Sequence, residues 1–243
     1  MKNLGGVMKI SLNRENFNSA LEKLKREYKI YAPIEIPFRG TFSDTSVIRY
    51  SEIDKIEEIC FDKKSHFSAK EVMLPITQTM FYFTEDNVKV PEEKNKKYLI
   101  FLRSCDLHSV KRVDEIYLNN KFLDIYYKKV RENVRFVVFG CPNSFENCFC
   151  VDMGTNKTDD YNIGIKVTDS EIFLDIKDEE FINYFANDRL NYRKQEFEME
   201  FVEDNEIHVD IPDNIELSDI INLDLWREYD SRCIACGKCN FVC

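Results

Sequence analysis

The last eleven residues carry the strongest chemical signal in the sequence. Their cysteines follow C-x-x-C-x-x-C-x-x-x-C spacing, at Cys233, Cys236, Cys239 and Cys243. Three thiolates at two-residue intervals can ligate three irons of a [4Fe–4S] cluster, and the fourth cysteine of such a run ligates the second cluster in two-cluster ferredoxins. The spacing therefore predicts a ferredoxin-type pair of iron–sulfur clusters, of which this chain holds only a part.

Two other chemistries would use the same thiols. Structural zinc also binds thiolates, but it usually takes two separated C-x-x-C pairs rather than an overlapping run. A pair such as Cys233 and Cys236 lowers thiol pKa values in thiol–disulfide enzymes, although that chemistry leaves Cys239 and Cys243 without a role. The run ends without the proline that completes the bacterial pattern, so we expect the sequence to stop inside its cluster-binding motif.

A second set of cysteines lies in the middle of the chain. Cys105 and Cys141 each follow an expected buried strand, and the sequence Asn-Cys-Phe-Cys places Cys148 and Cys150 on one side of an extended backbone. The carboxyl edge of a parallel sheet is where open α/β folds bind ligands. These four thiols therefore predict a metal site, an additional iron–sulfur cluster. The alternative is that they are small buried hydrophobic residues, as free cysteines often are.

The other candidate residues have simpler explanations. Cys60 has no partner by spacing and is expected in the core. Asp106 is expected to be the N-cap of the following helix rather than a further ligand. His108 lies one turn further and is expected to be a surface or packed side chain rather than one that tunes a cluster. His66 and His208 have no convergent partners in the sequence. We expect no catalytic residue in this chain.

The composition narrows the class of protein. The chain has 243 residues, with 44 acidic and 34 basic side chains and a formal charge of −10, which disfavours nucleic-acid binding. It shows no leader sequence and no apolar segment long enough to span a membrane, so we expect a cytoplasmic protein. An odd total of nine cysteines argues against a disulfide framework. The seven glycines form neither a dinucleotide fingerprint nor a P-loop.

Apolar patterns indicate the elements that position the cysteines. Short apolar runs at 98–102 and 136–139 flank helical patterns at 107–116 and 122–130, which is typical of a βαβ unit with strands buried on both faces. Alternation predicts a hairpin at 163–167 and 172–176 with one solvated face, and a similar strand at 197–201. Further expected elements are a helix capped by Asn13, strands at 30–36 and 47–50, a helix from Ser68 that stops near Pro75, and a last helix at 217–225.

These elements predict an α/β fold with a mixed or parallel sheet. The length fits one large domain or two small ones. We place an α/β domain with the strand-end cysteines at residues 1–160, a smaller β-rich and helical portion at 161–225, and the start of a C-terminal ferredoxin-like segment at 226–243.

Several of these stretches resemble a known family. Residues 105–118 begin with Cys-Asp-Leu-His, and residues 144–158 contain the Cys-Phe-Cys motif. With Phe-Ser-Asp-Thr at 42–45, the segment 75–83 and Tyr-Asp-Ser-Arg-Cys at 229–233, they resemble the A subunit of anaerobic sulfite reductase from about residue 9 to the end. A related family, the beta subunit of cytoplasmic sulfur-reducing hydrogenases, shares the strand-end Cys-Asp, the Cys-Phe-Cys and the ferredoxin run.

The resemblance implies an electron-carrying subunit with [4Fe–4S] clusters. Its partners would be a flavin- and NADH-binding subunit and a sirohaem subunit that reduces sulfite to sulfide. The resemblance implies that Cys233, Cys236 and Cys239 ligate the first ferredoxin cluster and that Cys243 ligates the second, while the remaining ligands of both clusters are absent from this sequence. The alternatives are the beta subunit of a sulfur-reducing hydrogenase and a zinc-stabilised structural module.

Overall fold

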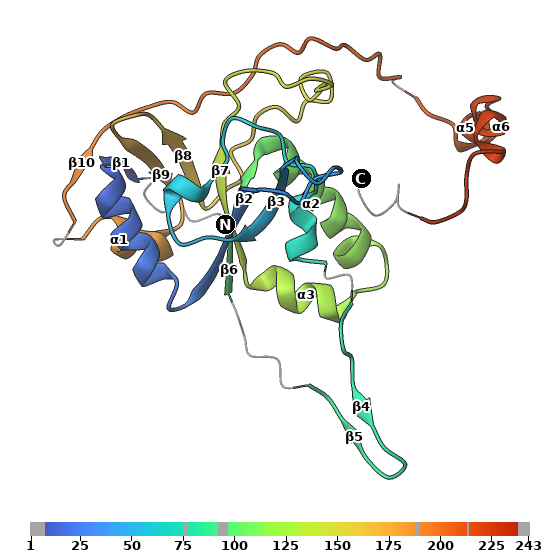
Figure 1. Ribbon diagram of the computed structural model, residues 1–243, viewed down its shortest axis with the longest axis horizontal. Coiled ribbons are helices and arrows are strands. Elements are labelled where there is room, and N and C mark those ends of the chain that lie inside the picture. The colour runs from blue at the N-terminus through green and yellow to red at the C-terminus, as the bar shows by residue number, and fades with distance from the viewer. Residues whose placement is uncertain (1–7, 75–76, 92–96, 188–189, 213, 238–243) are drawn as a thin grey trace.

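A mixed eight-stranded sheet forms the centre of the molecule (Figure 1). The computed structural model describes residues 8–74, 77–91, 97–187, 190–212 and 214–237. The strand order is β10-β1-β9-β8-β7-β6-β2-β3, in which β2, β6, β7 and β8 run parallel and the other neighbours pair antiparallel. The strands are β1 (Met8–Leu12), β2 (Tyr28–Ile36), β3 (Val47–Glu52), β6 (Lys97–Arg103), β7 (Val134–Phe139), β8 (Ile163–Val167), β9 (Ile172–Ile176) and β10 (Tyr192–Lys194). The predicted α/β class with a mixed sheet is confirmed.

Helices cover both faces of the sheet. The helices on the sheet are α1 (Arg14–Leu24), α2 (Ser104–Asp114), α3 (Ile125–Glu132) and α4 (Ile182–Phe185). α5 (Leu217–Ile221) and α6 (Leu225–Asp230) follow later in the chain, and shorter helical turns lie at 56–58, 69–72, 115–119 and 179–181. α1 and α4 pack on one face, and α2 and α3 pack on the other. Asn13 caps α1 as predicted, because its side chain accepts the N–H of Asn16 at 2.9 Å. No helix among the described residues is long and apolar enough to cross a membrane.

The predicted βαβ unit is β6, α2, α3 and β7. Along β6, Leu99 and Phe101 point into the core beneath α1, while Ile100 and Leu102 point into the core beneath α2. All four side chains are 1% exposed or less. This two-sided burial explains why the strand is an unbroken apolar run rather than an alternating one.

The hairpin predicted at 163–176 forms as β8 and β9, but its expected solvated face is wrong. Asp175 is buried and accepts a hydrogen bond from the Tyr161 hydroxyl at 2.8 Å. The ring of Phe173 packs against that of Phe197, with centroids 5.5 Å apart, so a later segment covers this face. Because β8 pairs with β7, strands on both sides of residue 160 share one sheet.

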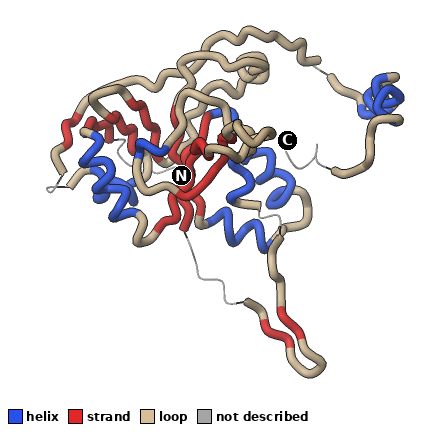
Figure 2. Tube along the Cα trace, in the orientation of Figure 1, coloured by secondary structure: helices blue, strands red, loops and turns tan. Residues whose placement is uncertain are grey.

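The strand predicted at 197–201 is also wrong. Residues 195–209, which we call the strap, leave the sheet after β10 and cross the ends of the neighbouring strands as irregular chain (Figure 2). The carbonyl of Phe197 accepts from Lys9 Nζ at 3.0 Å. The carbonyl of Glu200 passes so close to Gly140 that a Cβ atom there would overlap it. The alternating pattern therefore reports an extended chain packed on the sheet, not a strand paired within it.

Two shorter helices were predicted only in part. Ser68 caps a single helical turn at 69–72, with its hydroxyl accepting from Lys70 N at 3.3 Å, and Pro75 lies outside the described residues. The helix predicted at 217–225 is instead two helices, α5 and α6. Asn222 ends the first of them, because its side chain bonds the carbonyl of Ser218 at 2.7 Å.

One hairpin projects away from the sheet (Figure 1). It consists of β4 (Tyr82–Phe83) and β5 (Val88–Lys89), which pair only with each other. α5 and α6 also lie apart from the sheet, at the end of the segment that follows the strap (Figure 1). The two hydrophobic cores therefore lie on the two faces of the main sheet, beneath the helices that pack there.

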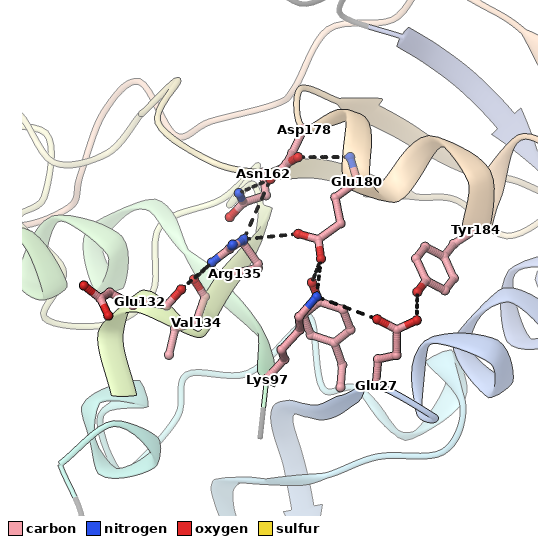
Figure 3. Close-up of polar contacts among 10 residues, drawn as sticks. Glu27, Lys97, Glu132, Val134, Arg135, Asn162, Asp178, Glu180 and Tyr184 are labelled. Carbon is pink, nitrogen blue, oxygen red and sulfur yellow. Dashed lines mark hydrogen bonds and ion pairs between the residues drawn. The ribbon is translucent and has the colours of Figure 1, made fainter. Parts of the chain in front are cut away.

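Charged side chains pair with one another at the amino edge, where β6 and β7 begin (Figure 3). Lys97 Nζ lies 2.6 Å from Glu180 and 3.7 Å from Glu27. Arg135 lies 3.5 Å from Glu180 and 3.8 Å from Asp178. These five side chains form one connected network in which each charge faces an opposite charge.

The pKa values at this edge follow from the pairing. Burial opposes ionisation of Glu180, but hydrogen bonds from Lys97 and Tyr28 outweigh it and lower the pKa of this carboxyl. The hydrogen bond to Glu180 raises the pKa of Lys97. Burial and a hydrogen bond to Glu27 raise the pKa of Tyr184 to about 12. The network therefore stabilises the charged forms of Lys97 and Glu180.

Candidate functional site

The strand-end thiols lie at the carboxyl edge of β6 and β7. Arg103 and Phe139 are partners in the register, so the two strands end level with each other. Cys105 lies in the first turn of α2, two residues beyond Arg103, and Cys141 lies two residues beyond Phe139. The structure thus places both thiols at neighbouring strand ends, as the sequence predicted.

The loop from 140 to 162 carries the other two internal thiols, Cys148 and Cys150, both half-buried. The strap fixes this loop through Asn205, which is only 3% exposed. Asn205 Oδ1 accepts the N–H of Val151 at 2.8 Å and lies 3.7 Å from the Cys150 sulfur. Asn205 Nδ2 donates to the Ser144 hydroxyl at 3.0 Å. The position of the Cys-Phe-Cys motif therefore depends on a residue far away in the sequence.

Three of the internal thiols interact electrostatically. Burial raises the pKa of Cys105, and Asp106, Cys141 and Cys150 raise it further. Part of the Cys105 surface is open to solvent, so the desolvation comes from the protein packed around and beneath the thiol. Burial also raises the pKa of Cys141, against the opposing effect of the neighbouring Arg103 guanidinium. Neutral thiols are therefore favoured at this edge until a cation binds them.

The four thiols are chemically suitable ligands for an iron–sulfur cluster, but the structure does not place them at ligating distances from one common point. Among the described residues, no three Cys, His, Asp or Glu side chains are close enough to hold a metal ion. Thiolate–metal bonds are about 2.3 Å long, so ligation requires the loop at 140–162 to bring its thiols inward. The four predicted ligands Cys105, Cys141, Cys148 and Cys150 remain a proposal.

Arg103 supplies a buried positive charge at this edge. It is 5% exposed, and its Nη2 donates to the carbonyls of Phe61 at 3.0 Å and Lys63 at 2.8 Å. The guanidinium carbon lies 4.9 Å from the ring centroids of both Phe139 and Phe145. Its Nε is buried with no hydrogen-bond partner. This donor remains available to an acceptor that binds beside the thiols.

Asp106 is not the N-cap that we predicted. Arg103 occupies that position, and Asp106 is three residues further, where its carboxylate accepts the N–H of Arg103 at 3.4 Å. The Tyr50 hydroxyl donates to the same carboxylate at 3.2 Å. Burial raises the pKa of Asp106 above its ordinary value, although the Arg103 charge lowers it. Asp106 therefore anchors the first turn of α2, the turn that carries Cys105.

A cavity of about 890 Å³ opens beside Cys141 on the α1 side of the sheet. Its walls include Phe61 and Phe139 from the protein core and Met199 from the strap. This volume is typical of small-molecule sites in proteins. The lining of the cavity beside Cys141 is mixed, with charged side chains as well as apolar ones.

Cys60 and the three histidines, which the sequence did not place among the ligands, make contacts of their own. Cys60 is buried, as predicted. His66 Nδ1 accepts the N–H of Ile48 at 2.9 Å, and His108 Nε2 lies 3.1 Å from the carbonyl of Lys157. His208 lies between two carboxylates that the sequence did not indicate, 3.3 Å from Asp152 and 3.5 Å from Asp204. His108 and His208 thus hold the loop and the strap in place.

The tail is only partly described. Cys233 and Cys236 are exposed, whereas Cys239 and Cys243 lie outside the described residues. Between and after the first two thiols, Ala235 has a φ of 54° and Gly237 a φ of 71°. Left-handed backbone at a non-glycine residue such as Ala235 is uncommon and marks a tight turn. The two described thiols are therefore accessible on a curled, non-helical segment.

Sequence reasoning missed Arg103 and Asn205. A signal for Arg103 was present, because a charged residue closes the apolar run at 98–102, two positions before Cys105. Asn205 belongs to a polar, acidic stretch with no periodic pattern, and its partner Cys150 lies 55 positions away. That contact could be found only from the folded chain.

The chain is similar to one characterised kind of protein. Over an alignment of 261 residues it is 27% identical to sulfhydrogenase 2 subunit beta of Pyrococcus furiosus, covering 96% of this chain and 71% of that protein. No family model matches the chain, and no solved structure matches it. The similarity extends over nearly the whole chain, well beyond the cysteine-rich tail, and supports the relation to hydrogenase beta subunits.

Proposed function

We propose that this chain is an iron–sulfur electron-transfer subunit of a sulfur-reducing hydrogenase complex. The observation that carries the proposal is the similarity to sulfhydrogenase 2 subunit beta along 96% of the chain. The two sets of thiols support it, because thiolates are the usual ligands of iron–sulfur clusters. In this role the chain binds clusters and relays electrons, while the bond-making chemistry belongs to another subunit.

The proposal assigns the thiols to separate cluster sites. The internal site would use Cys105, Cys141, Cys148 and Cys150, and the ferredoxin-like segment would use Cys233, Cys236 and Cys239 for one cluster and Cys243 for a second. A bound [4Fe–4S] cluster accepts and donates one electron at a time. Around the internal site, Arg103 supplies positive charge, and the rings of Phe139 and Phe145 pack against its guanidinium. Apolar surroundings and nearby charges are two means by which proteins set cluster potentials.

The proposal is tested on the full chain, purified without oxygen. We expect a brown protein that contains iron and acid-labile sulfide and that gives an EPR signal of a reduced cluster after treatment with dithionite. A colourless, iron-free protein loaded with zinc would contradict the proposal and favour the zinc-stabilised module. Disulfide reductase activity that disappears in Cys233→Ser, in a protein without iron, would favour the thiol–disulfide enzyme instead.

A second candidate function is the A subunit of anaerobic sulfite reductase. The Cys-Asp, Cys-Phe-Cys and ferredoxin-run motifs support it, but both families share them. The partners distinguish the two candidates: a nickel-containing hydrogenase subunit in one complex, or a sirohaem subunit with a flavin- and NADH-binding subunit in the other. Affinity purification from the native cell, followed by nickel analysis and a test for sirohaem absorption, separates them. We expect nickel and no sirohaem.

A further inference from the structure

Arg103 is a buried cation that carries an unpaired hydrogen-bond donor. Its Nη2 is bound by two backbone carbonyls, and its backbone N–H is bound by Asp106. The Nε–H has no acceptor although it is buried. An unpaired buried donor lowers the stability of the folded protein, and more so when the group is charged. Such a group is retained where a ligand supplies the missing acceptor.

The guanidinium is held in a fixed orientation. The rings of Phe139 and Phe145 each lie 4.9 Å from its central carbon, and the carbonyls of Phe61 and Lys63 hold one end. Since these contacts come from β7, the loop after it and the segment after β3, the side chain cannot turn without disturbing all three. The unused Nε–H is therefore positioned before any ligand arrives.

The position of Arg103 in the register brings it next to two proposed ligands. It is the last residue of β6, and its partner Phe139 is the last residue of β7. Cys105 and Cys141 each lie two residues further along their own chain segments. Arg103 therefore lies at the edge of the sheet from which the segments with both thiols continue.

We propose that Arg103 is a positioning residue that donates its Nε–H to sulfur at the carboxyl edge and stabilises the negative charge gained when an electron enters. The inference rests on the proposed iron–sulfur function. A cluster with thiolate ligands is anionic, and reduction adds one electron and one further negative charge without a proton. A buried cation stabilises the reduced form more than the oxidised form. Arg103 therefore raises the reduction potential of the internal site.

The experiment isolates the internal site in the full 243-residue chain. Serine replaces Cys233, Cys236, Cys239 and Cys243, so that only the internal thiols can hold a cluster. In this background we compare Arg103→Gln, Arg103→Lys and Arg135→Gln by EPR-monitored titration with dithionite. Arg135→Gln is the matched control, since it removes the same charge from the other end of the strands, about 13 Å away at about 3.3 Å per residue.

We expect Arg103→Gln to lower the one-electron reduction equilibrium constant at least tenfold, which corresponds to about 59 mV. Arg135→Gln should change it less than threefold. Arg103→Lys should give an intermediate decrease and an altered EPR line shape, because lysine keeps the charge but cannot reproduce the fixed Nε–H. Circular dichroism establishes that each variant is folded, and Arg103→Lys carries the test if Arg103→Gln does not fold.

Each contrary result has its own meaning. A background protein without iron overturns the proposed internal cluster, and with it the ligand that we assign to Arg103. A cluster whose potential and EPR spectrum are the same in the background protein, in Arg103→Lys and in every folded Arg103→Gln sample overturns the role of Arg103 alone. Equal shifts in Arg103→Gln and Arg135→Gln would also overturn it, because they would show only an effect of net charge.

Discussion

Charged side chains are paired at the amino edge of the parallel strands, whereas the carboxyl edge holds polar groups that are buried or without a partner. At the amino edge, Lys97 and Arg135 face Glu180, and the pKa of that carboxyl is lowered. At the carboxyl edge, burial raises the pKa of Asp106, and the Nε of Arg103 has no partner. The same strands therefore begin in a network that stabilises its charges and end in a site that leaves some of them unsatisfied.

This difference indicates where the fold is stabilised and where it is prepared for a ligand. Paired charges contribute to stability without any further molecule. An unpaired buried donor such as the Arg103 Nε–H lowers the stability of the free protein and becomes favourable only when an acceptor binds. The carboxyl edge of an open α/β sheet is also the edge at which ligands bind in other proteins of this architecture.

Removal of the internal thiols should have the largest effect. In the background without tail thiols, we expect Cys105→Ser and Cys141→Ser to abolish most bound iron, because each removes one proposed ligand. Stability of the iron-free protein should change by less than about 1 kcal/mol, since serine is close in size to cysteine. Iron analysis and urea unfolding measure the two quantities.

Cys60→Ser is the matched control for these variants. Cys60 is buried, has Asp62 as its partner at 3.5 Å, and is not one of the proposed ligands. We expect it to retain its iron. Equal loss of iron in Cys60→Ser and Cys141→Ser would mean that the thiols act through the fold and not as ligands.

Loss of the Asn205 side-chain bonds should have the next largest effect. Asn205→Leu leaves the N–H of Val151 and the hydroxyl of Ser144 without their partner, which costs about 1–3 kcal/mol. We expect faster hydrogen exchange in the loop at 140–162 and little change in β6. Asn156→Leu, which removes one bond from the same loop to the Val202 carbonyl, is the control and should have a smaller effect. Uniform acceleration over the whole chain would contradict a local role.

Sequence patterns located this site only in part, for identifiable physical reasons. Apolar runs bounded by helical periodicity predicted β6 and β7, and strand direction then placed Cys105 and Cys141 at one edge. The strap was mistaken for a strand, because an extended chain packed on a sheet alternates just as a paired strand does. Pairing depends on a free neighbouring edge, which the local sequence does not encode.

The side chains around the thiols were harder to predict than the strands. Arg103 and Asn205 act through contacts with carbonyls and amides of distant segments. Such contacts follow from where the loops cross, not from residue type or spacing. The thiols themselves were recognisable because cysteine chemistry is visible in the residue type alone.

Glu180→Gln should change the stability that comes from the amino edge without changing the thiol site at the carboxyl edge. We expect a loss of about 1 kcal/mol at neutral pH, because Lys97 and Arg135 lose their shared counter-charge. The folded pKa of Glu180 is lowered, so its contribution is present above its ordinary pKa of 4.5 and is lost as the pH falls through the folded value. Urea unfolding at about pH 7 and pH 4 should show a weaker acid dependence in the variant, while iron binding stays unchanged.

Asp106→Asn should have the smallest effect on stability, and its sign should be opposite to that of Glu180→Gln. The folded pKa of Asp106 is raised, so its contribution to stability is present at low pH and is lost as the pH rises through that value. At neutral pH the ionised carboxylate is therefore a cost. Asparagine keeps an acceptor for the N–H of Arg103 and the hydroxyl of Tyr50 but carries no charge.

We therefore expect the iron-free Asp106→Asn protein to be as stable as wild type at neutral pH, or more stable by about 0.5 kcal/mol. Measured beside Glu180→Gln, this variant tests the contrast directly, because both substitutions replace a carboxylate by its amide. Equal destabilisation by the two would mean that Asp106 is as well paired as Glu180. Opposite signs would mean that the carboxyl edge holds the Asp106 charge at a cost to stability, whereas the amino edge is stabilised by the charge of Glu180.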